Sequence, residues 1–454
     1  MSAHGLKASV EKMEAAGVPD AAVATFRHYY EQLEAGESGM LPESELEPIT
    51  DIPDADAFPD ADAPLDEAVI IKLNGGLGTS MGMEQAKSLV EVKDGLAFLD
   101  LIVRQVLALR KASGARLPLV LMNSFYTQAD SLARLEGYGD ELAADVPFDF
   151  VQHKEPKLLV DGLEPADWPD DPDLEWCPPG HGDIYTALLT SGMLDTLLAA
   201  GYRYAFMSNS DNLGAVLEPR ILAWFAAQGL PFLSEVTERT EADKKGGHLA
   251  RLKGGGLVLR ETAQTPDEDL DAFTDTHRHP YFNCNNLWMD LGALRDLLSA
   301  RDGVMGLPMI VNEKTVDPAD KSTPPVFQLE TAMGAAVGVF EGARAVRVPR
   351  SRFVPVKKTS DLLVLRSDAY VLGAGARVEL AEGRSGPPLV ELDDEFYKLL
   401  RDFDARFPDG APSLREAEKL AVAGDVTFGS GVVVRGDVSV EGPESVADGA
   451  VLEG

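Results

Sequence analysis

Apolar runs of strand length alternate with longer amphipathic runs between residue 68 and about residue 360. The strand-type runs are Ala68–Leu73, Leu117–Asn123, Phe148–Gln152 and Tyr204–Asn209. The helix-type runs are Phe98–Ala112, Gln128–Leu135, Asp183–Ala199 and Glu218–Gln228. Residues 248–262, with three glycines at 254–256, predict an inserted β-hairpin. The alternation predicts an α/β protein with a largely parallel sheet between helices, and such sheets bind ligands beyond the carboxyl ends of their strands.

The first 66 residues do not follow this alternation. Residues 6–35 carry apolar side chains at helical spacing. Between His28 and Ile71 there is no lysine or arginine, and prolines at 42, 48, 53, 59 and 64 interrupt an acidic segment. This composition predicts a helical N-terminal segment followed by an extended connector without a core of its own.

The C-terminal residues show a third pattern, a repeat of six residues. Val426, Val432 and Val438 form one series, and Phe428, Val434 and Val440 form a second. A six-residue repeat with interspersed glycines is typical of a β-helix, in which successive coils stack in parallel. A plain β-meander is the alternative interpretation of the same residues.

Charge restricts the partners of this chain. The 454 residues include 41 lysines and arginines against 75 aspartates and glutamates, a net charge of −34. Such a surface repels nucleic acid and anionic membranes, so neither is an expected partner. A site for phosphorylated ligands would have to gather its own cations, from lysines and a divalent metal.

The sequence also bears on the cellular compartment. It contains no run of 18 apolar residues, so no transmembrane helix is expected, and its first residues lack the apolar segment of a signal peptide. Cys177 and Cys284 are too few for a disulfide framework and lack metal-site spacing. We therefore expect a protein of the reducing cytoplasm.

A glycine-rich loop follows the first predicted strand. Residues 71–87 read Ile-Lys-Leu-Asn-Gly-Gly-Leu-Gly-Thr-Ser-Met-Gly-Met-Glu-Gln-Ala-Lys. Glycines allow a phosphate or base to approach backbone N–H groups, and Lys87 adds a positive charge. The spacing matches neither a P-loop nor a dinucleotide fingerprint. The loop predicts a nucleotide site of another type, with a purely structural turn as the alternative.

Two further loops carry candidate chemistry. Asp211 follows the strand-type run 204–209, where a carboxylate can hold Mg²⁺ against phosphate oxygens. Its alternative role is that of a turn or cap residue. His181 lies between two glycines at the start of a predicted helix, whose N-terminus favours an anion. A lone histidine in such a loop is otherwise structural.

Other blocks of sequence lie in a fixed order around these residues. They are Pro178–Asp183, Ser208–Gly214, Glu235–Thr237, Lys245–Gly247, Phe282–Trp288, Ile310–Asn312, Gln328–Thr331 and Val348–Leu363. Together with the glycine-rich loop, they resemble the eukaryotic-type UTP–glucose-1-phosphate uridylyltransferases (UDP-glucose pyrophosphorylases). The resemblance extends over about residues 65–454.

The resemblance implies a Rossmann-like nucleotidyltransferase fold of the GT-A type, with a mixed, mostly parallel sheet and a small C-terminal left-handed β-helix. It divides the chain into an N-terminal helical segment and connector (1–66), a catalytic domain (67–370) and a C-terminal domain (371–454). Some family members use the C-terminal strand to build larger assemblies. This chain is shorter, so a homo-oligomer formed through its C-terminal domain is left open.

The resemblance also implies roles for individual residues. The expected nucleotide-binding residues are Leu73, Asn74, Gly75, Gly76, Lys87, Gln152 and Gly180, with Gln152 matching one edge of uracil. The expected substrate-binding residues are His181, Asn209, Ser210, Asp211, Gly247, Asn285, Asn286 and Glu330, with His181 contacting uridine or substrate. Asp211 is the expected Mg²⁺ ligand, and Lys87 and Lys357 are the expected catalytic cations. Gly247, Asn285, Asn286 and Glu330 have an alternative role in satisfying buried backbone groups.

The chain departs from the family pattern in two places. Glu84-Gln-Ala-Lys87 stands where the eukaryotic pattern has Gly-Pro before the lysine, which indicates a bacterial member. His153-Lys-Glu155 follows Gln152 where the family has Ser-Arg-Tyr. The second departure makes the path of the chain beside Gln152 an open question.

The implied reaction is UTP + α-D-glucose 1-phosphate ⇌ UDP-glucose + pyrophosphate. We expect Mg²⁺-dependent, in-line uridylyl transfer without a covalent enzyme intermediate. One alternative is the same chemistry on galactose 1-phosphate or N-acetylglucosamine 1-phosphate. Another is a non-catalytic sugar-nucleotide sensor.

Overall fold

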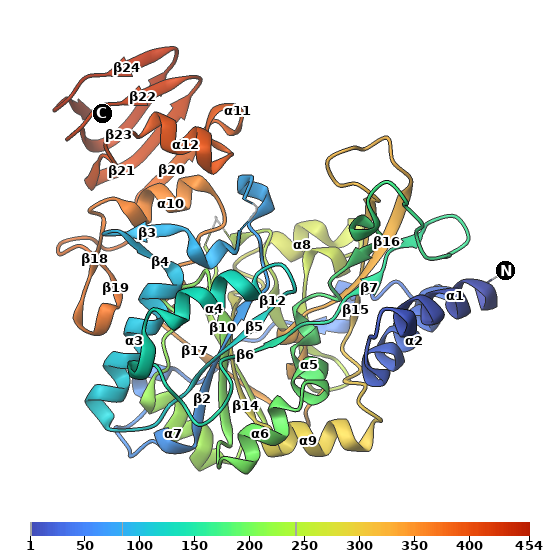
Figure 1. Ribbon diagram of the computed structural model, residues 1–454. Helices are drawn as coiled ribbons and strands as arrows, with labels where there is room; N and C mark the ends of the chain where they lie inside the picture. The colour runs from blue at the N-terminus through green and yellow to red at the C-terminus, as the bar shows by residue number, and fades with distance from the viewer. Residues whose placement is uncertain (1, 84, 241–242) are drawn as a thin grey trace.

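The computed structural model describes residues 2–83, 85–240 and 243–454 (Figure 1). A central sheet has the strand order β1-β12-β14-β10-β2-β5-β6, with β11 joined to β14, β17 to β11 and β13 to β12. Its strands are β1 (Leu46–Glu47), β2 (Ala68–Asn74), β5 (Leu119–Asn123), β6 (Asp149–Val151), β10 (Tyr204–Asn209), β11 (Phe232–Glu238), β12 (His248–Leu252), β13 (Leu257–Arg260), β14 (Tyr281–Asp290) and β17 (Arg344–Arg347).

The centre of this sheet is parallel. Strand β2 runs parallel to β5 and β10, and β5 runs parallel to β6. In register, Leu73 lies opposite Asn209 and Asn74 lies opposite Asn123. The carboxyl ends of these strands therefore meet at one edge. Strand β14 is antiparallel to β10, so the sheet is mixed. The predicted α/β fold class is confirmed.

Helices cover both faces of the sheet. They are α3 (Phe98–Ser113), α4 (Gln128–Glu136), α5 (Ile184–Thr190), α6 (Met193–Ala199), α7 (Pro219–Gln228), α8 (Leu270–Thr274) and α9 (Leu291–Ala300). Ile70 and Phe206 belong to the apolar cluster that includes α3 and α7. Their neighbours Ile71 and Met207 belong to the cluster that includes α5, α6 and α9. Successive strand residues thus face opposite layers, as the pleat requires.

The predicted single helix over Asp183–Ala199 is wrong. The chain forms α5 and α6, separated at Ser191 and Gly192. Gly192 has φ +73°, a left-handed conformation that ends one helix and precedes the next. The Ser191 hydroxyl accepts a hydrogen bond from the backbone N–H of Met193, at the start of α6.

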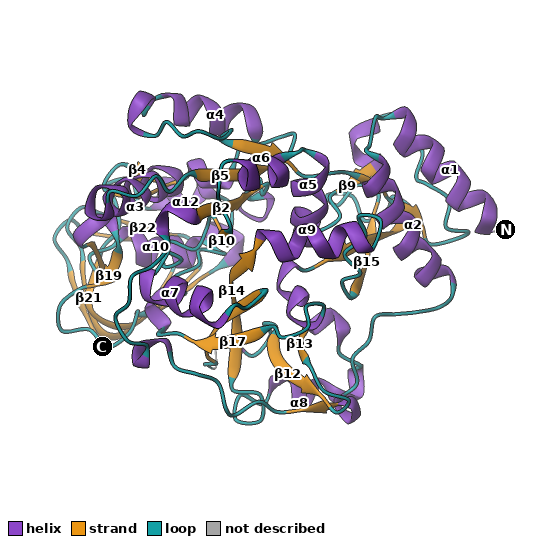
Figure 2. Ribbon diagram, turned by 90° about the horizontal axis from the view of Figure 1, so that it is seen from below, coloured by secondary structure: helices purple, strands orange, loops and turns teal. Residues whose placement is uncertain are grey.

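The N-terminal helices α1 (Ser2–Ala15) and α2 (Asp20–Glu34) lie beside a smaller sheet of β8 (Leu158–Leu159), β15 (Met309–Thr315) and β16 (Pro325–Thr331). Near it, β7 (Glu155–Pro156) pairs with β9 (Trp176–Cys177). The connector then follows the central sheet, where β1 pairs with β12 and Asp54 bridges to Arg347. In both views, the N-terminal helices and the C-terminal strands lie at opposite ends of the molecule (Figures 1 and 2).

The C-terminal coils confirm the six-residue repeat. Strands β20 (Leu389–Leu392), β21 (Ser413–Ala423), β23 (Val433–Glu441) and β25 (Val451–Glu453) form one parallel sheet, and β22 (Val426–Phe428) and β24 (Glu444–Val446) form another. Val426 pairs with Glu444 and Val433 with Val451, so these last coils take 18 residues each, or three six-residue units. The first pairing, of Leu389 with Lys419, spans 30 residues. Parallel pairing rules out a meander, whose neighbouring strands are antiparallel.

Short elements connect these coils to the central sheet. They are β3 (Glu91–Lys93), β4 (Leu96–Ala97), α10 (Thr359–Arg366), β18 (Tyr370–Leu372), β19 (Val378–Leu380), α11 (Asp394–Tyr397) and α12 (Leu400–Arg406). One apolar cluster continues from the central sheet through α10 into the coils. Among the helices in the described part of the chain, none has the length and apolar character needed to cross a bilayer.

Candidate functional site

A cavity of about 320 Å³ opens at the carboxyl edge of the parallel strands. Strands β2, β5, β6 and β10 each contribute a lining residue at or just beyond their ends. The predicted residues Leu73, Asn74, Gly75, Gly76, Lys87, Gln152, Gly180, His181, Asn209, Ser210 and Asp211 all line it. Ser88, Met122 and Pro178, which the sequence analysis did not single out, complete the lining.

The glycine-rich loop forms one wall of this cavity. A Cβ at Gly75 would lie 3.0–3.1 Å from the amide atoms of Gln152, so a larger residue here would displace that side chain by a few tenths of an ångström. The loop returns at Lys87, whose backbone N–H donates to the Gly76 carbonyl at 3.0 Å. Glu84, part of the departure noted in the sequence, lies outside the described residues.

Lys87 and Asp211 face each other across the cavity. The Lys87 ammonium donates to a carboxylate oxygen of Asp211 at 2.7 Å, and both side chains are about four-fifths buried, with exposed fractions of 17% and 26%. Among the described residues that line the cavity, Lys87 is the only lysine or arginine. Asp211, the expected metal ligand, thus forms an ion pair with the Lys87 ammonium in this structure.

Asp211 is the acid that could bind a divalent metal here. Among the described residues, no cluster of three or more His, Cys, Asp or Glu side chains could hold a metal ion. A magnesium ion at Asp211 would therefore take its remaining ligands from phosphates and water, which Mg²⁺ commonly does. The residues present fit a metal that binds together with a nucleotide.

His181 is held as a neutral imidazole. Its Nδ1 accepts a hydrogen bond from the backbone N–H of Met333 at 3.0 Å, so Nε2 carries the ring hydrogen. Burial lowers the pKa of His181 to about 4. At neutral pH this side chain can donate a hydrogen bond from Nε2 but is not a proton carrier.

Two polar atoms beside the cavity have no protein partner. Asn285 donates from Nδ2 to Asn209 Oδ1 at 2.9 Å, while its own Oδ1 is buried without a partner. The hydroxyl of Ser210 is buried without a partner as well. Asn285 has φ +56°, an uncommon backbone conformation that directs this side chain from β14 toward the end of β10. Such atoms cost free energy unless a ligand or water satisfies them.

Asn286 lies in a different environment. Its side chain is fully buried; Nδ2 donates to Glu235 at 3.0 Å, and Oδ1 accepts from Asn212. Both ends of the amide therefore have protein partners. This arrangement corresponds to the alternative role, in which Asn286 satisfies buried groups and does not line the cavity.

Lys357, Gly247 and Glu330 also lie outside the cavity lining. The Lys357 ammonium lies 6.0 Å from the centre of the Phe282 ring. A Cβ at Gly247 would lie 2.5 Å from the Glu261 carboxylate, so that carboxylate packs directly on the glycine. Burial raises the pKa of Glu261, and the nearby Lys357 charge opposes this shift. Burial likewise raises the pKa of Glu330.

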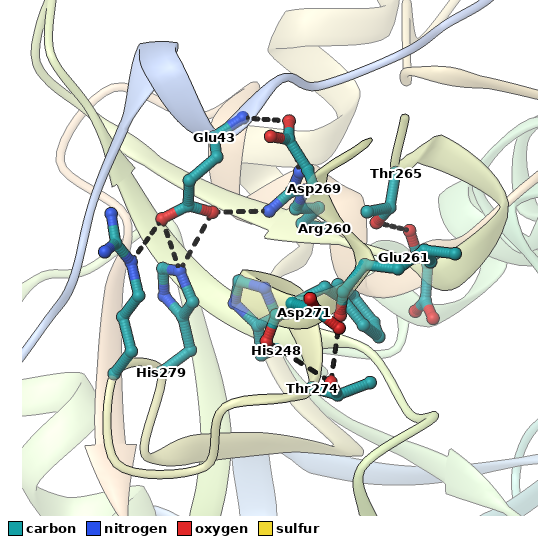
Figure 3. A network of polar contacts seen from close by, with 12 residues as sticks. Glu43, His248, Arg260, Glu261, Thr265, Asp269, Asp271, Thr274 and His279 are labelled. Atoms are coloured by element: carbon teal, nitrogen blue, oxygen red, sulfur yellow. Dashed lines mark hydrogen bonds and ion pairs between the residues drawn. The ribbon is translucent and has the colours of Figure 1, made fainter. Parts of the chain in front are cut away.

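The N-terminal connector contacts the residue next to Glu261 (Figure 3). Glu43 accepts a hydrogen bond from Arg260, the neighbour of Glu261, at 2.7 Å. The same carboxylate contacts His279, which stacks on His248 with ring centres 4.0 Å apart. Glu43 therefore adds a side-chain attachment of the connector to the central sheet, beside the pairing of β1 with β12 and the bridge from Asp54 to Arg347.

A buried ionic network beneath the cavity was missed in the sequence analysis. Arg352 makes two hydrogen bonds to Glu235, at 2.8 and 2.6 Å, and the Trp288 ring N–H donates to the same carboxylate. Asn212 connects this network to the Asp211 loop and accepts from the backbone N–H of Val354. These residues lie in blocks that carry the resemblance, but only the fold shows that they pair.

Lys72 is a second missed residue. It is 2% exposed, and its ammonium donates to Ser208 Oγ and to the Ala215 carbonyl, each at 2.7 Å. Burial lowers the pKa of Lys72 to about 7. The lysine joins the ends of β2 and β10 directly below the cavity.

Comparison with known proteins places this geometry in context. The UTP–glucose-1-phosphate uridylyltransferase family pattern matches residues 23–435. The chain is 43% identical to the UTP–glucose-1-phosphate uridylyltransferases of Hordeum vulgare and Solanum tuberosum, over 86% of this chain and 81% and 80% of theirs.

Solved structures agree with the sequence comparison. A UDP-glucose pyrophosphorylase mutant from Leishmania major, in complex with UDP-glucose, aligns with a TM-score of 0.93 at 43% identity, covering 99% of this chain and 98% of that chain. A UDP-glucose phosphorylase from Trypanosoma brucei aligns with a TM-score of 0.92 at 43% identity, with the same coverage.

Proposed function

The chain belongs to the UTP–glucose-1-phosphate uridylyltransferase family and catalyses formation of UDP-glucose from UTP and glucose 1-phosphate, and we propose that the cavity at the ends of β2, β5, β6 and β10 is its reaction centre. The observation that carries the proposal is the shared lining of this cavity by the glycine-rich loop, Gln152 and Asp211.

The nucleotide is placed by the walls of this cavity. The loop 74–76 gives the base and ribose a surface without bulky side chains, and Gln152 beside Gly75 offers both a donor and an acceptor to uracil. The phosphates then extend toward Lys87 and Asp211. The sugar phosphate approaches from the side of Asn209 and Asn285. There Ser210 Oγ and Asn285 Oδ1 are buried without a protein partner and could bind it.

Mg²⁺ is part of the proposal, with Asp211 as its protein ligand. Bound there, the ion would neutralise charge on the UTP phosphates. Lys87 occupies the same carboxylate in this structure, so nucleotide binding has to draw its ammonium away. The support is the fit of a single carboxylate, beside a lysine, to a metal that is otherwise coordinated by phosphate and water.

The transfer itself needs no proton carrier. A phosphate oxygen of glucose 1-phosphate forms the new bond to the α-phosphorus of UTP, and the bond to the β-phosphate oxygen breaks, releasing pyrophosphate. Attacking and leaving oxygens are both anionic, so positioning and charge neutralisation supply the catalysis. His181, neutral with a pKa of about 4, contributes a hydrogen bond to substrate.

Lys357 completes the proposed machinery after a movement. Its exposed side chain lies against Phe282 and outside the cavity lining. The residue before it contacts the site, since the backbone N–H of Val356 donates to the Asp211 carbonyl at 3.1 Å. Solved structures of the Leishmania major enzyme are described as open and closed. Closure of this segment over the substrates would bring the Lys357 ammonium to the phosphates.

The test is pyrophosphate release with UTP, Mg²⁺ and each of three sugar 1-phosphates. We expect strong preference for glucose 1-phosphate over the galactose and N-acetylglucosamine analogues, and loss of turnover in Lys357→Ala. Equal turnover with another sugar 1-phosphate would show that the enzyme is not specific for glucose 1-phosphate. UTP binding without turnover on any sugar would contradict the enzymatic assignment and favour the sensor hypothesis.

The remaining parts of the proposal concern the setting of the enzyme. Cys177 and Cys284 are both unpaired and buried, which suits the reducing cytoplasm. A bacterial origin and a homo-oligomer formed through the C-terminal coils stay predictions from the sequence. So does the division of the chain at residues 66 and 370.

A further inference from the structure

We infer that His153 and Asp183 form a positioning pair that fixes Gln152 against the opposite wall of the cavity and thereby sets the enzyme's discrimination for uracil. The inference rests on the proposed role of Gln152 in reading the base. Neither His153 nor Asp183 lines the cavity, so they would act through Gln152 and not by touching the substrate.

The contact joins two separate walls. His153 follows Gln152 just beyond β6, and Asp183 ends the Gly180–Asp183 loop that carries His181. The backbone N–H of His153 donates to one oxygen of Asp183 at 2.7 Å, and the ring Nδ1 donates to the other at 2.8 Å. Both oxygens of the carboxylate are therefore used by one residue of the facing wall.

The pair is shielded and further fixed. The His153 and Asp183 side chains are 8% and 4% exposed. The imidazole Nε2 lies 2.8 Å from the Thr190 hydroxyl on α5, so the ring is held at both nitrogens. On the other side of Gln152, its backbone N–H donates to the Asn123 carbonyl at 2.8 Å. The backbone is thus fixed directly before and directly after the side chain that contacts Gly75.

The pair also explains how this chain accommodates its departure from the family pattern. His153 is the first residue of that departure, and its ring supplies the contacts to Asp183 and Thr190. A buried carboxylate that loses the ring donor keeps only the backbone N–H. The Gly180–Asp183 loop and the end of β6 would then separate more easily. The backbone that positions the Gln152 side chain would no longer be held in one place.

The experiment compares His153→Ala, His153→Asn and Gln152→Ala for KM with UTP, KM with glucose 1-phosphate, and the UTP/CTP ratio of kcat/KM. Loss of the buried ring hydrogen bond to Asp183 leads us to expect about a tenfold rise in the UTP KM and a similar fall in the UTP/CTP ratio for His153→Ala. Asparagine, which retains one N–H donor near the Nδ1 position, should restore most of both. The KM for glucose 1-phosphate should stay within about twofold.

Thr190→Val is the matched comparison, because it removes the hydroxyl beside Nε2 and leaves the Asp183 contact intact; its UTP/CTP ratio should fall by less than that of His153→Ala. Should His153→Ala not fold, Asp183→Asn gives the same readout with the ring in place. An unchanged ratio in His153→Ala, with a reduced one in Gln152→Ala, would overturn the inference. An unchanged ratio in Gln152→Ala would overturn the proposed base-reading role itself, and the inference with it.

Discussion

The nucleotide side and the sugar side of the site are built differently. On the nucleotide side, the Gly75–Gln152 contact and the Lys87–Asp211 ion pair are in place. On the sugar side, Lys357 lies against Phe282 and Asn285 leaves a buried oxygen without a partner. In the proposed function, the nucleotide side needs only the Lys87 ammonium to leave Asp211, whereas the sugar side needs the segment that carries Lys357 to move.

The difference follows from the elements that carry each side. Parallel strands β2, β5, β6 and β10 are held in register by backbone hydrogen bonds, so their ends form a rigid edge. The sugar side uses the hairpin β12–β13, a bend in β14 and the segment after Arg352. The hairpin and β14 are also joined by backbone contacts, since His248 pairs with Phe282 and the Asn283 N–H donates to the Gly247 carbonyl. The proposed adjustability of this side therefore rests with Lys357, whose side chain is exposed and lies outside the cavity lining.

Replacing Lys357 on the sugar side should have the largest effect on turnover. With Ala at this position, we expect kcat to fall about 10²- to 10⁴-fold, because a cation aimed at the transferring phosphates is lost. UTP binding, measured by calorimetry, should remain near that of the parent chain, since the residue lies outside the cavity lining. Lys358→Ala is the matched control and should retain turnover. Equal loss in both variants would show that the segment, and not one ammonium group, is required.

Replacing Asp211 on the nucleotide side should reduce catalysis somewhat less than replacing Lys357. In Asp211→Asn we expect about a 10³-fold loss of kcat/KM and a weaker response of the remaining rate to Mg²⁺. The Lys87 ammonium also loses its charged partner. Measuring the rate as a function of Mg²⁺ concentration at saturating UTP gives the metal dependence of each variant. An unaltered metal dependence would remove Asp211 as the ligand.

The buried network beneath both sides should affect stability more than catalysis. Glu235→Gln weakens two hydrogen bonds from Arg352 and leaves that guanidinium buried without a countercharge. We expect the free energy of unfolding to fall by about 3 kcal/mol. Urea unfolding followed by fluorescence of the buried Trp288 gives the value. Glu238→Gln, on the exposed end of the same strand, is the control and should change little.

The smallest effect concerns pH and Lys72. Its pKa in the folded protein is lowered to about 7 from an ordinary 10.5, so the folded state binds fewer protons than the unfolded state between these values. Stability should therefore rise with pH over this window, by at most about 1.4 kcal/mol per pH unit, and the full penalty should apply below pH 7.

Lys72→Met tests this directly. The variant should lose the Lys72 contribution to the slope of unfolding free energy between pH 7 and pH 9, although Ser208 and the Ala215 carbonyl lose their donor at every pH. A slope identical to that of the parent chain would show that the amine stays charged in the fold.

Part of the site could be predicted because its residues are adjacent to strand ends in the sequence. Gly75, Gln152 and Asp211 each follow a predicted strand, and parallel pairing brings such positions together. Asn286, expected from the resemblance and one residue beyond Asn285 on β14, lies outside the cavity lining. A neighbour in a strand faces the opposite side, and there Asn286 meets Glu235 instead of the cavity.

The sequence by itself determined the alternation of strands and helices, the six-residue repeat of the C-terminal strands and the glycine-rich loop, because each depends on residues that are close along the chain. The tertiary structure alone decided that Glu235 pairs with Arg352, that Glu43 holds the hairpin and that His153 meets Asp183. These partners are separated by 117, 217 and 30 residues. Their pairing depends on burial, which raises the cost of an isolated charge and makes its nearest partner decisive.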